Sequence, residues 1–128
     1  MRFVRSLCLT LLLALAAAPC AWAHARLIRA DPKSGADLPA SPKRIELWFN
    51  ELLEDGFNTV KIFPAADVAA EKKRNFAKDK PQVDRADRTH VIVELTPLPP
   101  GEYIIEWRVL SRDGHSAPGR STFRVRTP

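Results

Sequence analysis

The most regular pattern in the chain is the run GEYIIEWRVLS, residues 101–111. Glu106 and Arg108 alternate there with large apolar side chains. These apolar residues occupy every second position: Tyr103, Ile105, Trp107 and Val109. Because successive side chains of a β-strand point to opposite faces of the sheet, the pattern predicts a long strand with one buried face and one solvated face.

Four more runs alternate in the same way: RIELWFN (44–50), NTVKIF (58–63), HVIVELT (90–96) and STFRVRT (121–127). Prolines and glycines such as Pro99-Pro100-Gly101 and Pro118-Gly119 are expected between strands, where a missing N–H does not interrupt a ladder. Short strands, frequent turns and little helical periodicity predict an all-β fold, an antiparallel β-sandwich. We expect Leu47, Trp107 and Phe123 to meet in its core.

The first 23 residues have the three-part layout of a secretory signal peptide. Two arginines precede an apolar run, Leu7–Ala18, and a small-x-small triplet ends at Ala23. The run is too short for a membrane-spanning helix, which needs about 20 residues. We therefore expect export and cleavage after Ala23, leaving one domain, residues 24–128. A second Ala-x-Ala triplet ends at Ala25, and cleavage there would remove His24.

Composition excludes several functions for residues 24–128. The formal charge of +5 for the whole chain includes the two leader arginines, and no basic stripe is interleaved with aromatic residues, so nucleic acid is not expected as a partner. Cys8, Cys20 and Met1 all lie in the leader. Thiol catalysis and sulfur ligands are therefore absent from the exported domain. Any metal ligand there must be an imidazole, a carboxylate, a backbone group or the terminal amine.

The segment SRDGHSAPG, residues 111–119, follows the long predicted strand and carries Asp113 and His115 two positions apart. In extended backbone these side chains point the same way and can converge on one ion. An Asp-Gly turn with an exposed histidine remains the alternative. By its phase, His90 is expected at the surface of its strand.

After cleavage, His24 would carry a free amine as well as its imidazole, and the two can chelate one metal ion. The amine has a pKa of about 8, so its proton is readily displaced by a metal. The alternative is a signal peptidase that merely tolerates histidine at this position. With Asp113 and His115 the set offers three nitrogens and one oxygen, which suits Cu(II) or Ni(II), while zinc accepts the same atoms.

Residues 65–88 are charged and weakly patterned. We expect a solvated connection with one short helix or edge strand. A basic docking surface is the alternative.

Two blocks resemble the CopC family of periplasmic copper-binding (copper resistance) proteins: HARLIRADPKSGADLPASPKRIELWFNE (24–51) and LPPGEYIIEWRVLSRDGHSAPGRSTFRV (98–125). The resemblance implies a Greek-key, immunoglobulin-like sandwich of about seven strands. It implies a Cu(II) site formed by His24, Asp113 and His115, with Glu51 orienting a ligand or water. The chain lacks the methionine-rich Cu(I) site that some members carry.

The resemblance and the leader together predict a periplasmic Cu(II)-binding protein, not an enzyme, that sequesters or carries copper for homeostasis or resistance. Its expected partners are the copper ion and either an inner-membrane, CopD-like copper transporter or another periplasmic carrier. We expect a monomer that is not embedded in the membrane after processing. Two alternatives stay open: a copper oxidative enzyme resembling polysaccharide monooxygenases, and a metal-free protein-interaction module.

Overall fold

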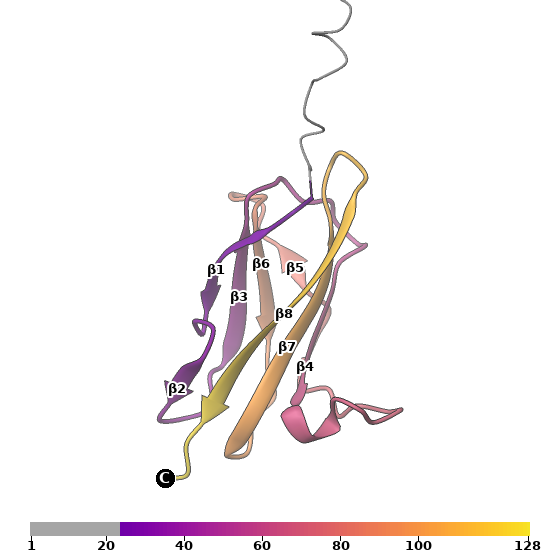
Figure 1. Ribbon diagram of the computed structural model, residues 1–128. Helices are drawn as coiled ribbons and strands as arrows, with labels where there is room; N and C mark the ends of the chain where they lie inside the picture. The colour runs from indigo at the N-terminus through magenta and orange to yellow at the C-terminus, as the bar shows by residue number, and fades with distance from the viewer. Residues whose placement is uncertain (1–23) are drawn as a thin grey trace, which may run out of the picture.

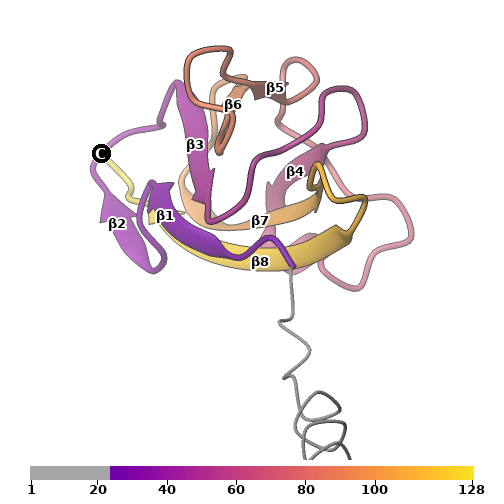
Figure 2. The ribbon, with the colours of Figure 1, turned by 90° about the horizontal axis from the view of Figure 1, so that it is seen from above.

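A computed structural model describes residues 24–128, which form two four-stranded sheets packed face to face (Figures 1 and 2). One sheet has the order β1-β3-β6-β5 and the other β2-β8-β7-β4. The strands are β1 (Leu27–Asp31), β2 (Ala36–Leu38), β3 (Arg44–Phe49), β4 (Thr59–Pro64), β5 (Gln82–Val83), β6 (His90–Glu94), β7 (Gly101–Leu110) and β8 (Ser116–Val125). Neighbours such as β3 and β6 are not consecutive in the chain, because the chain crosses between the sheets, as in Greek-key sandwiches. The predicted all-β sandwich is confirmed.

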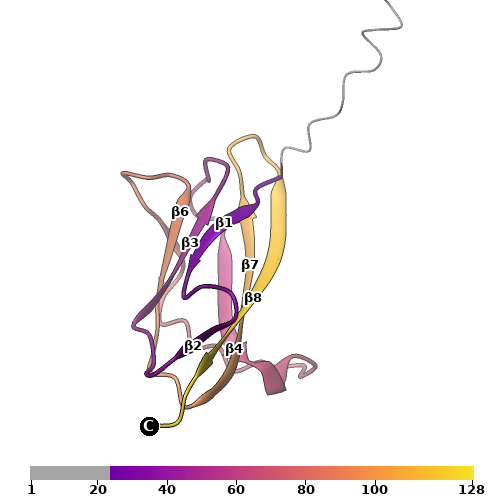
Figure 3. The same ribbon diagram turned by 60° about the vertical axis from the view of Figure 1, so that its left-hand side comes forward.

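The longest hairpin positions the turn between β7 and β8 at one end of the sandwich. Its strands, each ten residues long, pair from Gly101 with Val125 to Leu110 with Ser116. The described chain begins at the same end, beside this turn, while the C-terminus lies at the opposite end (Figures 1 and 3). Segments far apart in the sequence therefore meet at one end of the molecule.

The core lies between the sheets, and the three residues predicted for it are buried: Leu47, Trp107 and Phe123. The Trp107 indole meets the ring of Phe49 edge-on, with centroids 6.1 Å apart. Tyr103 stacks on Phe123 with centroids 5.6 Å apart. The first contact joins the two sheets, whereas the second joins neighbouring strands of one sheet. Burial of such large aromatic groups is a major source of stability in a domain of this size.

Two features differ from the sequence-based expectation. β2 pairs with β8 in parallel, so one sheet is mixed. Pro118 and Gly119 lie inside β8 instead of between strands. Pro118 is tolerated because β2 pairs with β8 only from Phe123 onward, which leaves one edge of β8 unpaired at the proline.

Residues 65–88 form a largely exposed connection, as predicted. It contains a short 3-10 helix, η1 (Ala65–Asp67), and the two-residue edge strand β5. Asp67 and Arg74 hold it together with two side-chain hydrogen bonds of 2.8 and 2.9 Å. Among residues 24–128, no helix is long and apolar enough to cross a membrane.

Gly119 makes room for the Trp107 indole. A Cβ atom built at Gly119 would lie well inside van der Waals contact with the indole Cζ2 and Cε2 atoms. Its backbone is not in the left-handed region, so crowding alone opposes a side chain there.

Gly119→Ala is therefore expected to lower the free energy of unfolding by about 1–3 kcal/mol, as other overpacked cores do. Urea denaturation measures the change. Thr122→Ala, an exposed position on the same strand, is the control and should change stability by less than about 0.5 kcal/mol. Equal stability of the two variants would show that Gly119 is not needed for packing of the indole.

Candidate metal centre

The turn after β7 is fixed by its own backbone. Ser111 N–H donates to the carbonyl of His115 at 3.0 Å, and Gly114 N–H donates to the carbonyl of Ser111 at 2.9 Å. Gly114 has a φ of 90°, a conformation that residues with a Cβ rarely adopt. The glycine thus allows the tight turn that brings residues 113 and 115 together.

Within this turn the carboxylate of Asp113 faces the ring of His115. Asp113 Oδ1 lies 3.1 Å from His115 Nδ1 and accepts the His115 backbone N–H at 3.0 Å. The hydroxyl of Ser111, followed by the backbone and ring of His115, lowers the pKa of the Asp113 carboxyl to about 2. Asp113 is therefore ionised at neutral pH. The side chain of His115 is 56% exposed, so its ring is open to a ligand.

His24 reaches this turn from the other end of the described chain. Its ring lies edge-on to the ring of His115, with centroids 5.5 Å apart and an interplanar angle of 89°. Two hydrogen bonds anchor the segment that follows it: Arg26 N–H donates to Asn50 Oδ1 at 2.6 Å, and Asn50 N–H donates to the Arg26 carbonyl at 3.0 Å. Asn50, directly after β3, therefore holds the start of the described chain in place.

The sequence analysis missed this role of Asn50. The available signal was an amide side chain at the end of a strand, where it can bond the backbone of a neighbouring segment. That signal is weak, because it does not say which segment is bonded.

The structure brings His24, Asp113 and His115 together but does not join Glu51 to them. Glu51 lies in a half-buried bend after β3, and its carboxylate makes no hydrogen bond or ion pair within residues 24–128. In that part of the chain, no three His, Asp or Glu side chains converge on one point in the manner of a finished metal site. A free amine at His24 would require cleavage after Ala23, and the residues before His24 lie outside the described part of the chain.

His90 is buried, and its expected place at the surface was wrong. Its phase on β6 is as predicted, but its ring stacks on Trp48 of β3 with centroids 4.2 Å apart and only 8% of the residue is exposed. Arg29 covers the Trp48 ring at 4.2 Å from its centroid. The alternation along the strand predicted the correct face of the sheet for His90. It could not show that Trp48, itself covered by Arg29, buries the His90 ring on that face.

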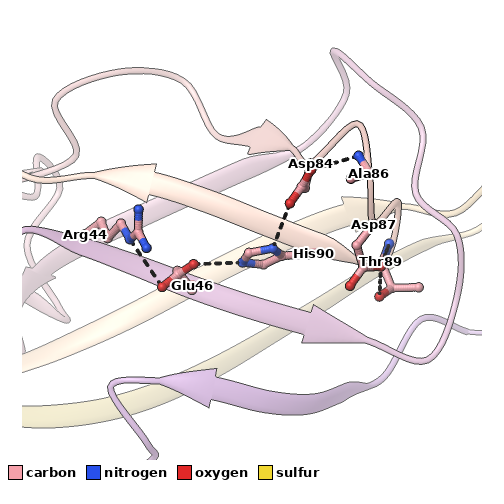
Figure 4. A network of polar contacts seen from close by, with 7 residues as sticks. All are labelled: Arg44, Glu46, Asp84, Ala86, Asp87, Thr89 and His90. Carbon is pink, nitrogen blue, oxygen red and sulfur yellow. Dashed lines mark hydrogen bonds and ion pairs between the residues drawn. The ribbon is translucent and has the colours of Figure 1, made fainter.

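The two ring nitrogens of His90 face different carboxylates (Figure 4). Nδ1 is within hydrogen-bond reach of Asp84 Oδ2 at 3.4 Å, and Nε2 lies at an ion-pair distance of 3.1 Å from Glu46 Oε1 without hydrogen-bond geometry. The backbone N–H of Ala86 is the largest cause of a lowered pKa at Asp84, and His90 adds to it. Because its nitrogens point to opposite sides, His90 is placed to support β3 and β5, not to share a metal with either carboxylate.

Comparison with known proteins gives the chain its family. Residues 27–126 match the CopC domain. The chain is 36% identical over 109 residues to protein YobA of Escherichia coli K12, covering 84% of this chain and 83% of that protein. It is 33% identical over 106 residues to copper resistance protein C of Pseudomonas syringae pv. tomato, covering 83% of each. The crystal structure of CopC from Methylosinus trichosporium OB3b superposes with a TM-score of 0.70 at 25% identity, covering 80% of this chain and 94% of that one. The chain therefore belongs to the CopC family.

The contrast between His90 and His115 can be measured as stability. His90→Ala is expected to lower the free energy of unfolding by about 1–3 kcal/mol, because it removes a buried ring that stacks on Trp48 and takes one contact from each of two carboxylates. His115→Ala, an exposed turn position, should cost less than about 0.5 kcal/mol in the metal-free protein. Urea denaturation of both variants checks this. Equal costs would contradict a structural role specific to His90.

Proposed function

We propose that this protein is exported to the periplasm, binds Cu(II) and sequesters or carries it for copper homeostasis or resistance. The ligands are the amine and ring of His24, the ring of His115 and the carboxylate of Asp113. The observation that carries this proposal is the 5.5 Å separation of the His24 and His115 rings, which come from segments far apart in the sequence.

That separation suits a shared metal ion. With metal–nitrogen bonds of about 2 Å, two imidazoles on one ion have ring centroids roughly 4.5 to 6.5 Å apart, depending on the angle between them. The observed 5.5 Å falls inside this span, so the rings need only reorient. Asp113, ionised and in contact with His115, adds a negative charge next to the cation.

The donor atoms favour Cu(II) over Cu(I). Nitrogen and oxygen donors in a tetragonal arrangement suit Cu(II), whereas Cu(I) prefers sulfur. Residues 24–128 contain no cysteine or methionine. The name of the Pseudomonas relative, copper resistance protein C, supports copper as the metal. We assign Glu51 the role of orienting a ligand or water, because it lies just after Asn50, which anchors the segment carrying His24.

Processing completes the site in this proposal. The leader, residues 1–23, lies outside the described residues. Cleavage after Ala23 would convert the His24 peptide nitrogen into a free amine beside its own ring. The domain assigned to residues 24–128 would then begin with a ready-made chelate at the end of the sandwich that carries Asp113 and His115.

We propose binding and transfer, not catalysis. An oxygen-activating copper enzyme needs an open coordination position, and Asp113 would fill one here. The site lies at one end of the domain with His115 exposed, which gives a partner direct access to the metal. Such a partner would be an inner-membrane, CopD-like transporter or another periplasmic carrier, and the protein would act as a monomer.

Loss of the terminal chelate should weaken Cu(II) binding more than the roughly 10- to 100-fold that loss of an outer partner costs. His24→Ala, His115→Ala and a form with one extra residue before His24 should all show this in competitive Cu(II) titrations. His90→Ala is the control: its ring faces Asp84 and Glu46 and contacts none of the proposed ligands, so the affinity of this variant should match that of the unaltered protein. Unchanged affinity in the His24→Ala and extended forms would rule out the chelate.

A further inference from the structure

The segment that carries His24 lies just before β1 and is held by the residues that follow it. Ala25 belongs to the core, with only 7% of the residue exposed. Leu27, the first residue of β1, pairs with Phe49 of β3 and packs against the same core. His24 itself is exposed, but the residue directly after it is already buried.

Arg26, between these two core residues, pairs with Asn50 in an irregular way. In an antiparallel ladder that pairs Leu27 with Phe49, the next pair outward is Arg26 with Asn50. The Asn50 N–H donates to the Arg26 carbonyl at 3.0 Å, as in a regular strand. The return bond differs, because the Arg26 N–H donates at 2.6 Å to the side-chain Oδ1 of Asn50 and not to its main-chain carbonyl. The Asn50 side chain thus extends the ladder by one pair.

The side chain takes this place because the chain changes direction at Asn50. β3 ends at Phe49, and Asn50 lies in a bend. A bend turns the main-chain carbonyl away, whereas a short amide side chain can still bond the backbone of a neighbouring segment. Among residues 24–128, the Arg26 N–H has no other acceptor. Without Asn50 the pairing would stop at Leu27, and chain ends that are not tied down are poorly ordered.

We propose that Asn50 is a positioning residue of the copper site: its side chain fixes the backbone at Arg26 and so holds His24 beside His115 before a metal ion arrives. The proposal rests on the function proposed above. A terminal chelate on a loose chain end must be ordered when it binds, and fixing the backbone of one residue lowers an affinity roughly tenfold. With the Asn50 contact, folding has already ordered the segment, and the two rings lie 5.5 Å apart between centroids.

The metal-free exported protein tests the contact itself. In hydrogen-exchange NMR, the Arg26 amide of the unaltered protein is expected to exchange slowly, and Asn50→Ala should speed its exchange. An Arg26 amide that exchanges in the unaltered protein as fast as in an unstructured chain would overturn the proposal. This result does not depend on whether any variant folds.

Competitive Cu(II) titrations test the consequence for the site. Asn50→Ala should weaken binding about 10- to 100-fold. Asn50→Asp keeps the acceptor oxygen and adds a negative charge, so it should bind at least as tightly as the unaltered protein. Asn75→Ala is the matched control, since Asn75 Oδ1 also accepts backbone N–H groups, those of Ile62 and Ala77 at 3.1 and 3.2 Å, and none of its partners is a proposed ligand. Its affinity should be unchanged. An equal loss in Asn50→Asp and Asn50→Ala would contradict the role of the oxygen.

A double variant shows whether the effect passes through His24. In the His24→Ala background only the terminal amine is left to be positioned, so Asn50→Ala should cost less affinity there than in the unaltered protein. The same fold-loss in both backgrounds would show that Asn50 acts independently of His24, which would overturn the proposal.

The proposed function and the role of Asn50 fail separately. If the unaltered protein does not bind Cu(II), the proposed function is wrong even where the Arg26 amide exchanges slowly. If it binds Cu(II) and Asn50→Ala binds with the same affinity, the function stands and Asn50 has no positioning role.

Discussion

The ladder between β7 and β8 is the constraint on which the proposed metal site depends. It pairs the strands along their whole length and delivers the turn 111–115 to one end of the sandwich. His24, the other part of the proposed site, lies on the segment before β1. Asn50, directly after β3, anchors that segment through its hydrogen bonds with Arg26. The proposed site therefore joins two segments through the tertiary fold and not through a local motif.

His90 and His115 show how the fold separates a stabilising histidine from one proposed to bind metal. His90 stacks on Trp48 between two carboxylates, and His115 lies exposed in a turn held by Ser111 and Gly114. Their surroundings differ because a strand in the middle of a sheet has neighbours on both sides, whereas a turn at its end has room for a ligand. A metal ion bound at His115 would contact the exposed turn and would not require the core to rearrange.

Much of the fold could be predicted from the sequence. Period-2 alternation predicted the main strands and the burial of Trp107 and Phe123. A strand that is buried on one face carries an apolar residue at every second position, and this pattern is visible in the sequence. Pro118 was misplaced outside a strand, since nothing local tells that β8 has an unpaired edge there. For the candidate site, the residue types of Asp113 and His115 and their two-residue spacing were enough to predict that these side chains lie close together. The anchoring by Asn50 and the burial of His90 depend on partners more than twenty residues away in the chain, and no local pattern shows them.

The central claim is that cleavage creates the first half of the metal site. The N-terminal sequence of the protein recovered from the periplasm tests it most directly, without metal or mutation. The account predicts that the exported chain begins His-Ala-Arg, with His24 first. A chain that begins at Arg26 would contradict it, because the fold would remain while the amine and ring of His24 would both be lost.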